Sequence, residues 1–431
     1  MHRLLTGWLA SCLVFAAVTA QAKTTAQIRW IESWGTAQPL SPAAPPPIRG
    51  GAPALAKSGP PVAAAPSPMV PFPATLKDQT VRMIVRTSTG GSRFRLEFSN
   101  ALGGEPVSFG SIHAALARRG GAIAAGSDRR VTFGGKSSLT LFPGAEAVSD
   151  PIDLAVPALA EIAVSIYVPD STATNTVHTL GLNPTYVVAG NATDAARLER
   201  PDVVRSYFWL KGLSVPAANG RAGTVVAFGD SITDGYATTA GKHADWPELL
   251  AGRLQANAGT KGWGVVNAGI SGNRILRPGA GDAAVARFDE DVLARPGVKW
   301  VILLEGINDI NMSIMPIMPE SEHVSAEQII AGLRQLIARA HLHGIKVAGA
   351  TVMATKGLPF YNDQGKSMWQ QVNAWIRTSG AFDTVIDFDA VTRDPADPLR
   401  INPAFDPGDH VHPNDAGNRA MADAIDLEIF R

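Results

Sequence analysis

The chain of 431 residues contains a single cysteine, Cys12, and this cysteine lies close to the first residue. A chain with no second cysteine has no internal disulfide, and it also lacks the residues for a Cys-ligated zinc site or, beyond position 12, a thiolate nucleophile. An excess of charge is missing too, since 38 basic residues balance 38 acidic residues. No run of basic residues is present, so we predict neither nucleic acid nor an anionic membrane surface as a partner.

A long apolar run is also missing, because the stretch 4–18 is too short for a membrane span and is interrupted by polar residues. It follows the basic start Met1-His2-Arg3 and precedes the small residues Ala20-Gln21-Ala22. This order is typical of a signal peptide, which we place at residues 1–22. We therefore expect an exported protein, periplasmic or secreted, with no stable membrane insertion after cleavage. The residues ending at Cys12 resemble a bacterial lipobox, so a lipoprotein remains the alternative.

The N-terminal half reads as a series of short strands. Residues 28–37 predict a first strand, and the Pro- and Ala-rich stretch 39–73 predicts a long loop. From Thr80 to about Val215, alternating apolar and polar residues recur between turn signals. This spacing is typical of a β-sandwich of jelly-roll type, which we place at residues 23–215. The aromatic run Ser206–Leu210 is a candidate last strand, whose rings either pack in the core or form a sugar-stacking platform.

After a predicted linker at 216–223 the pattern changes to alternating strands and helices over residues 224–431. Such βα units predict a parallel sheet with helices on both sides. The expected strands are 224–229, 264–268, 299–305, 345–352 and 384–388, and the expected helices lie near 246–257, 282–294, 325–343, 366–379 and 415–429.

Four polar segments stand at strand ends or before a helix in this half. Ser231 follows the buried, β-branched strand 224–228, and the other three segments are 267–273, 306–309 and 409–413. The carboxyl ends of strands in a doubly wound sheet form one rim, where ligands bind. We therefore expect the four segments to lie close together, although each alone is also explained by ordinary turn residues.

Together these residue types suit acyl transfer. A serine nucleophile such as Ser231 needs a general base, and His412 can accept its proton. Asp409 lies three residues before His412 and can orient the imidazole from its other nitrogen. The developing oxyanion needs fixed donors, which the backbone N–H of Gly272, the amide of Asn308 and the N–H of Ser231 can supply.

The sequences GDSIT, ISGN, GIND and DHVHP in these segments resemble the four signature blocks of the SGNH (GDSL) hydrolase family. The resemblance spans roughly residues 224–431 and implies a flavodoxin-like αβα sandwich and ester hydrolysis without a metal or other cofactor. It also implies Ser231, Gly272, Asn308, Asp409 and His412 as site residues. The β-rich half is similar to a module that precedes the catalytic domain in some secreted bacterial members. Ser231 lacks the G-x-S-x-G surroundings of α/β-hydrolases.

We therefore expect an exported serine esterase that removes short acyl or acetyl groups from a small-molecule or carbohydrate ester. The alternatives are a lipase or thioesterase with a longer acyl pocket, and a carbohydrate-binding surface protein with an inert domain. Of the other polar residues, His410 is a second candidate base, and Asp230 and Asp309 are expected to orient loops. His341 and His343 end a predicted helix and are interpreted as solvated C-terminal caps.

Overall fold

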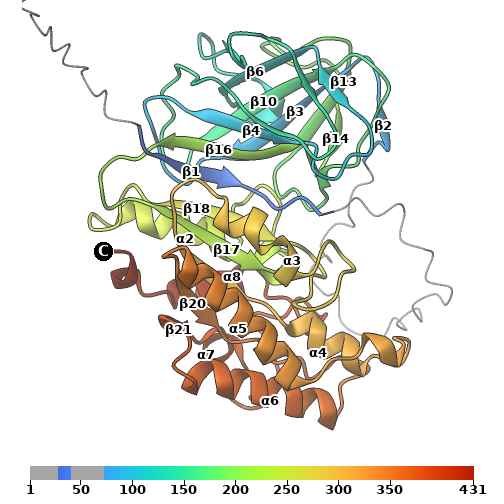
Figure 1. The fold of residues 1–431 in the computed structure, drawn as a ribbon, viewed down its shortest axis with the longest axis vertical. Coiled ribbons are helices and arrows are strands. Elements are labelled where there is room, and N and C mark those ends of the chain that lie inside the picture. The colour runs from blue at the N-terminus through green and yellow to red at the C-terminus, as the bar shows by residue number, and fades with distance from the viewer. Residues whose placement is uncertain (1–27, 40–71) are drawn as a thin grey trace, which may run out of the picture.

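The structure, a computed structural model, describes residues 28–39 and 72–431. The predicted signal peptide 1–22 and the part of the predicted loop between 40 and 71 lie outside these ranges. Figure 1 shows two layered units, which we call the β-module (residues 28–39 and 72–216) and the α/β unit (residues 224–431). Within the described ranges, no helix has both the length and the apolar character that a membrane crossing requires.

The β-module is a sandwich of two antiparallel sheets around one apolar core, as the alternating pattern predicts. In Arg93–Phe98 the apolar side chains Phe94, Leu96 and Phe98 are fully buried, while the polar residues between them are partly exposed. This alternation places one face of the strand in the core.

The four-stranded sheet has the order β1 (Trp30–Gly35), β16 (Leu210–Pro216), β4 (Arg95–Ser99), β9 (Glu146–Val148). The six-stranded sheet has the order β14 (Asp202–Val204), β13 (Thr185–Ala189), β3 (Gln79–Arg86), β10 (Glu161–Val168), β6 (Ser111–Leu116), β7 (Arg129–Arg130). Three short pairs complete it: β2 (Thr75–Leu76) with β11 (Thr172–Ala173), β5 (Val107–Phe109) with β8 (Leu139–Leu141), and β12 (Val177–His178) with β15 (Tyr207–Phe208).

The expectation that Ser206–Leu210 forms the last strand of the β-module is wrong. Trp209 has a positive φ of 54°, which breaks the extended chain between β15 and β16. The last strand is β16, which runs from Leu210 to Pro216 and pairs with β1 and β4. Tyr207, Phe208 and Trp209 are at most 6% exposed. These rings therefore pack in the core, and they offer no surface on which a sugar could stack.

The α/β unit is built on a parallel sheet with the order β18 (Gly264–Gly269), β17 (Thr224–Gly229), β19 (Val298–Leu304), β20 (Lys346–Ala350), β21 (Thr384–Ile386). Numbered within the unit this is 2-1-3-4-5, the flavodoxin-like order that the family resemblance implies. Every residue of β17 is buried, because helices cover both faces of the sheet. The order reverses between β17 and β19, and such a switch point opens a crevice for ligands at the carboxyl ends of the strands.

Two groups of helices enclose this sheet, and their members are packed within each group. One group consists of α2 (Trp246–Ala256), α7 (Phe388–Thr392) and α8 (Asp415–Asp423). The other consists of α3 (Ala284–Phe288), α4 (Ile307–Ile314), α5 (Ala326–Leu342) and α6 (Asp363–Thr378). The expected helix 282–294 continues past α3 as a π-helical turn at Asp289–Leu293, and the expected helix 415–429 ends at Asp423 before a short turn at Leu427–Phe430. Three elements were not predicted: α4, α7 and the single turn α1 (Ser231–Asp234).

The two units meet along β1, which lies between the sandwich and the parallel sheet (Figure 1). The Glu32 N–H donates to the Thr224 hydroxyl at the start of β17, over a distance of 2.9 Å. A Cβ on Gly264, at the start of β18, would stand only 1.9 Å from the Glu32 carbonyl oxygen. Only glycine therefore permits this approach. Ala37, just after β1, is fully buried in the core of the α/β unit.

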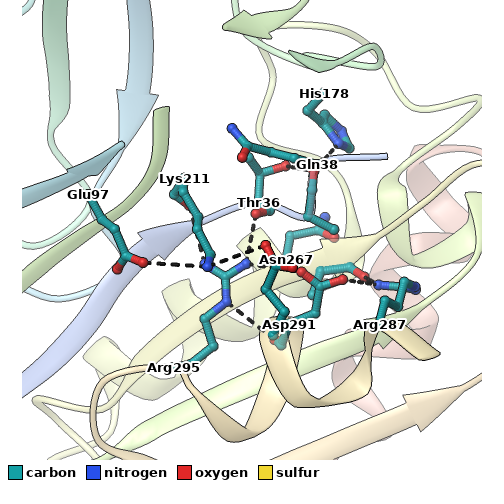
Figure 2. Close-up of polar contacts among 12 residues, drawn as sticks. Thr36, Gln38, Glu97, His178, Lys211, Asn267, Arg287, Asp291 and Arg295 are labelled. Carbon is teal, nitrogen blue, oxygen red and sulfur yellow. Dashed lines mark hydrogen bonds and ion pairs between the residues drawn. The ribbon is translucent and has the colours of Figure 1, made fainter. Parts of the chain in front are cut away.

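A buried ionic cluster crosses the same boundary (Figure 2). Arg295 of the α/β unit is 1% exposed at its side chain and donates to the Glu32 carboxylate of β1 at 3.0 Å. Its Nη2 donates to the Thr36 carbonyl at 2.7 Å and lies 3.5 Å from the Asp291 carboxylate. Lys211 of β16 joins the cluster through three carboxylates, those of Glu97, Glu146 and Glu290. The boundary is therefore held by buried charges as well as by apolar contacts.

Candidate active site

Ser231 begins α1, directly after β17 and beside the switch point of the sheet. Asp230 caps this single turn by accepting a hydrogen bond from the Ile232 N–H at 2.9 Å. The backbone N–H of Ser231 donates to no acceptor among the residues that the structure describes. The nucleophile candidate thus has its hydroxyl at the end of a buried strand and a free N–H at the start of a helical turn.

The structure brings Ser231, His412 and Asp409 into one hydrogen-bonded chain. The Ser231 Oγ lies 2.8 Å from the His412 Nε2, and the His412 Nδ1 lies 2.8 Å from the Asp409 Oδ2. The other oxygen of Asp409 accepts the N–H groups of Val411 and His412, both at 2.9 Å. Burial alone would raise the pKa of Asp409, but these bonds and the charge of His412 hold it below its usual value. The carboxylate therefore stays ionised and fixes the imidazole.

Gly272 occupies the third position of a tight turn, Ile270–Asn273, after β18. The Asn273 N–H donates to the Ile270 carbonyl at 3.0 Å, and Gly272 has a φ of 82°. A positive φ at this position is the signature of a type II turn and favours glycine. The Gly272 N–H has no acceptor within the described ranges. It is therefore available to a ligand, as the sequence leads us to expect.

Asn308 lies in the first turn of α4, directly after β19, on the other side of the switch point. Its side-chain nitrogen donates one hydrogen to the Asn273 carbonyl at 2.9 Å. This bond fixes the orientation of the amide relative to the turn that carries Gly272. An amide nitrogen carries two hydrogens, so the second N–H stays available for a ligand.

A buried arginine that we did not predict, Arg287, connects the ends of two strands of the sheet. It donates to the Gly229 carbonyl of β17 at 2.9 Å, to the Ala268 carbonyl of β18 at 2.8 Å and to the Asn273 side chain at 2.9 Å. Arg287, Asp291 and Arg295 recur at intervals of four residues in a helical stretch that is otherwise largely apolar. This spacing of charged residues is the sequence feature that could have identified Arg287, because charged residues on a buried helix face need partners.

Three buried carboxyl groups that follow strand ends, those of Asp230, Glu305 and Asp309, have raised pKa values. Burial raises the pKa of Asp230 to about 7, that of Asp309 to about 6 and that of Glu305 well above its usual value. Asp309 accepts the N–H of Ile275 at 2.7 Å and that of Leu276 at 3.3 Å, so it fixes the chain after the Gly272 turn. These contacts agree with the expectation that Asp230 and Asp309 orient loops.

The remaining histidines lie apart from the Ser231 hydroxyl. His410 forms a pair with Asp406, with 2.6 Å between its Nδ1 and the carboxylate, whereas His412 contacts Ser231. His341 lies in the last turn of α5, is 44% exposed at its side chain and pairs with Asp383. His343 is the C-terminal cap of the same helix, as expected. In the described part of the chain, no three His, Cys, Asp or Glu side chains are grouped so that they could hold a metal ion.

Tyr236 covers one side of the His412 imidazole. The ring centroids are 4.4 Å apart at an interplanar angle of 49°, and Tyr236 is 36% exposed. The loop that follows is fixed to α8 because the Thr239 N–H donates to the Asp415 carboxylate at 2.7 Å. We did not identify Tyr236 from the sequence, since nothing in the order of residues shows which ring faces His412.

The comparisons with known proteins agree with the four motifs. Residues 227–420 match the model of the GDSL-like lipase/acylhydrolase family. Among solved structures, the acetylxylan esterase Axe2 from Geobacillus stearothermophilus is 25% identical over 50% of this chain and 95% of its own, with a TM-score of 0.39. A putative lipolytic protein of the G-D-S-L family from Desulfitobacterium hafniense is 23% identical over 47% of this chain and 96% of its own, with a TM-score of 0.36. A search of curated proteins found no match.

Proposed function

We propose that this chain, whose residues 227–420 match the model of the GDSL-like lipase/acylhydrolase family, is an exported serine esterase that removes short acyl groups through an acyl-Ser231 intermediate. The reaction class is carboxylic ester hydrolysis. The observation that carries the assignment of roles is the hydrogen-bonded chain Ser231–His412–Asp409, with 2.8 Å at each contact. It unites residues that are 181 and three positions apart in the sequence.

In the first half-reaction, the Ser231 oxygen attacks the ester carbonyl carbon while its proton passes to the His412 Nε2. Asp409 stabilises the resulting imidazolium through the Nδ1 hydrogen without taking that proton. The tetrahedral intermediate collapses when the C–O bond to the leaving alcohol breaks, and the leaving oxygen receives the proton from His412. The products of this step are the free alcohol and the acyl-Ser231 ester.

In the second half-reaction, His412 accepts a proton from water, and the water oxygen attacks the acyl carbon. The bond to the Ser231 oxygen breaks, and His412 returns the proton to that oxygen. The carboxylic acid is released and the resting enzyme is restored. In both steps the oxyanion is stabilised by the N–H groups of Ser231 and Gly272 and by the second amide hydrogen of Asn308.

Two features support a short acyl group on a polar substrate. Ser231 is only 6% exposed, and an acetyl group needs less room beside it than longer acyl groups do. Tyr236 supplies an exposed aromatic face next to His412, and such a ring suits the apolar face of a sugar while its hydroxyl remains in water. Export rests on the sequence of residues 1–22, which lie outside the described residues.

The experiment is a chain-length series of p-nitrophenyl esters, from acetate to octanoate, together with an acetylated oligosaccharide. We expect the highest kcat/KM on acetate, release of acetate from the oligosaccharide, and labelling of Ser231 by a fluorophosphonate probe. Ser231→Ala is the matched control, because it removes one oxygen atom and with it the covalent intermediate.

The other outcomes identify the alternatives. A maximum at octanoate would replace the short-chain esterase by a lipase or thioesterase. Absence of turnover and of labelling, with sugar binding retained, would favour a carbohydrate-binding surface protein. Labelling of another serine, with Ser231→Ala still active, would overturn the assignment of the nucleophile.

A further inference from the structure

One side chain of the β-module lies two hydrogen bonds away from the turn Ile270–Asn273 of the α/β unit. We call this turn, which presents the Gly272 N–H, the oxyanion turn. His178 is the last residue of β12, and its Nε2 lies 3.0 Å from the Asp234 Oδ1 at the end of α1. The other carboxylate oxygen of Asp234 accepts both the N–H of Ser271, at 2.9 Å, and its hydroxyl, at 2.6 Å. Ser271 directly precedes Gly272. Asp234 thus connects the two units at the turn that presents the Gly272 N–H.

His178 is held in one orientation and faces only acceptors. Its Nδ1 lies 2.8 Å from the Ala37 carbonyl, and its Nε2 also lies 3.1 Å from the Leu180 carbonyl. Two ring nitrogens that both contact acceptors require a hydrogen on each, which is the imidazolium form. Burial alone would lower the pKa of His178, but Asp234 and the two carbonyls hold it above its usual value. Figure 2 shows the ring beside the segment that contains Thr36 and Gln38.

Both partners are buried, with 5% of the His178 side chain and 3% of the Asp234 side chain exposed. A buried carboxylate that loses its cationic partner keeps an uncompensated charge, so it reorients or takes up a proton. Either response weakens its two bonds to Ser271. Ser271 is the second residue of the type II turn, and the peptide that joins it to Gly272 carries the N–H in question. Rotation of that peptide would turn the N–H away from the oxyanion.

We propose that His178 is a positioning residue of the esterase site, an imidazolium supplied by the β-module that fixes the oxyanion turn through Asp234 and Ser271. This inference rests on the proposed function and deepens it. The β-module then has a part in the reaction itself, whether or not it also binds substrate.

The test measures kcat and KM on p-nitrophenyl acetate in the full chain, for the wild type and for His178→Ala. Displacing the Gly272 N–H weakens binding of the transition state more than binding of the ester. Small displacements of such a group lower the rate by up to about 100-fold. We expect kcat to fall about 10- to 100-fold while KM changes less than about threefold. The inhibition constant of a small alkylboronic acid, whose tetrahedral adduct on Ser231 places an oxygen in the same hole, should rise by a similar factor.

Two further variants separate positioning from stability. His178→Gln keeps a hydrogen-bond donor within reach of the Asp234 carboxylate but not the positive charge, so it should restore only part of the lost kcat. His113→Ala is the matched control, because His113 is also a buried histidine of the β-module, 6% exposed and paired with Asp128. It lies on β6, on the side of the β-module away from the α/β unit (Figure 1), so it should lower the melting temperature and leave kcat unchanged.

The proposal is overturned if folded His178→Ala keeps the wild-type kcat. Should His178→Ala fail to fold, Ser271→Ala decides, because it removes the 2.6 Å bond from the other side of Asp234. An unchanged kcat in Ser271→Ala then overturns the proposal, and a several-fold loss supports it. A wild type that neither turns over ester nor reacts with a fluorophosphonate would instead defeat the proposed function.

Discussion

The rim of the parallel sheet and the boundary with the β-module both contain an aspartate beside a histidine, but the two pairs differ in burial. At the rim, 16% of the His412 side chain and 37% of the Asp409 side chain are exposed. At the boundary, the corresponding fractions for His178 and Asp234 are 5% and 3%. A proton at the rim can pass to substrate or water. We expect the boundary pair, which is almost fully buried, to hold the neighbouring groups in place.

Two ion pairs that contain an arginine also differ in burial. Arg295 and Glu32 are at most 1% exposed at their side chains, whereas the pair Arg93–Asp153 on the β-module surface is 41% and 77% exposed. Removing one partner of a buried pair leaves a charge without compensation, but an exposed charge finds water instead. Burial therefore decides whether a pair carries chemistry, holds the units together or does little. If burial decides the role of a group, the effect of changing one ion pair or one hydrogen-bond donor should depend on how deeply that group is buried.

The largest effect is expected from Asp409→Asn at the rim. An amide in place of the carboxylate no longer favours the histidine tautomer that accepts the Ser231 proton. We expect kcat on p-nitrophenyl acetate to fall by about 10⁴-fold with the fold intact. Asp406→Asn is the control, because Asp406 pairs with the neighbouring His410 and should matter far less. Equal losses in the two variants would mean that both aspartates only shape the loop.

Arg295→Leu tests the boundary. It leaves Glu32 and Asp291 without their shared cation in a buried site. Breaking a buried pair in this way costs about 3–5 kcal/mol of unfolding free energy. Urea unfolding of the full chain measures it, and Arg93→Leu should cost less than about 1 kcal/mol because its partner is exposed. If the two variants unfold at the same urea concentration, burial does not set the strength of these pairs.

Asn308→Ala returns to the rim and removes a neutral donor rather than a charge. Loss of one oxyanion donor typically lowers kcat by about 10²–10³-fold, or about 2.7–4 kcal/mol, with little change in KM. Asn308→Asp should be at least as harmful, since a carboxylate would face the oxyanion. Kinetics on both variants, with thermal melts as the control for folding, distinguish this role from that of a turn former. A nearly neutral Asn308→Asp would support the turn former.

The sequence revealed the rim far better than the boundary, for physical reasons. The residues of the rim follow buried strands whose β-branched runs are easy to recognise, and Asp409 and His412 are neighbours in the chain. The parallel sheet was predicted strand by strand, and β17 matches its expected range of 224–229. The boundary depends on pairs such as Glu32 with Arg295, 263 positions apart, and nothing local marks them as partners.

Three other features were also not visible in the sequence. Trp209 carries the positive φ that ends β15, but a tryptophan gives no local sign of such a conformation, which usually belongs to glycine. The helix α4 was hidden because its first residues read as a loop motif. His178 looked unremarkable because its partner Asp234 belongs to the other unit. What local patterns cannot predict is the contact between units, which only the folded chain creates.

The smallest change for each measured step, at most about 1.4 kcal/mol per pH unit, is expected in the pH dependence of the boundary. Glu32 is fully buried, and burial raises its pKa to about 7, while Arg295 draws it down and Glu97 pushes it up. Its Oε2 has no hydrogen-bond partner among the described residues. The folded chain therefore keeps a proton on Glu32 between about pH 4.5 and 7 that the unfolded chain releases. By linkage, the stability that this proton supplies is complete below about pH 4.5 and is lost as the pH rises to about 7.

Glu32→Gln should remove this dependence, because glutamine keeps an oxygen for Arg295 and does not titrate. We expect the wild type to lose up to about 1.4 kcal/mol of unfolding free energy per pH unit in that window through Glu32, and the variant to lack this contribution. Urea unfolding of both proteins in steps from pH 4.5 to 8 measures the difference, in which the titration of the other groups cancels. The curves should meet near pH 4.5, with the variant more stable at pH 8. Parallel curves would mean that Glu32 is ionised throughout and that Arg295 outweighs the cost of burying its charge.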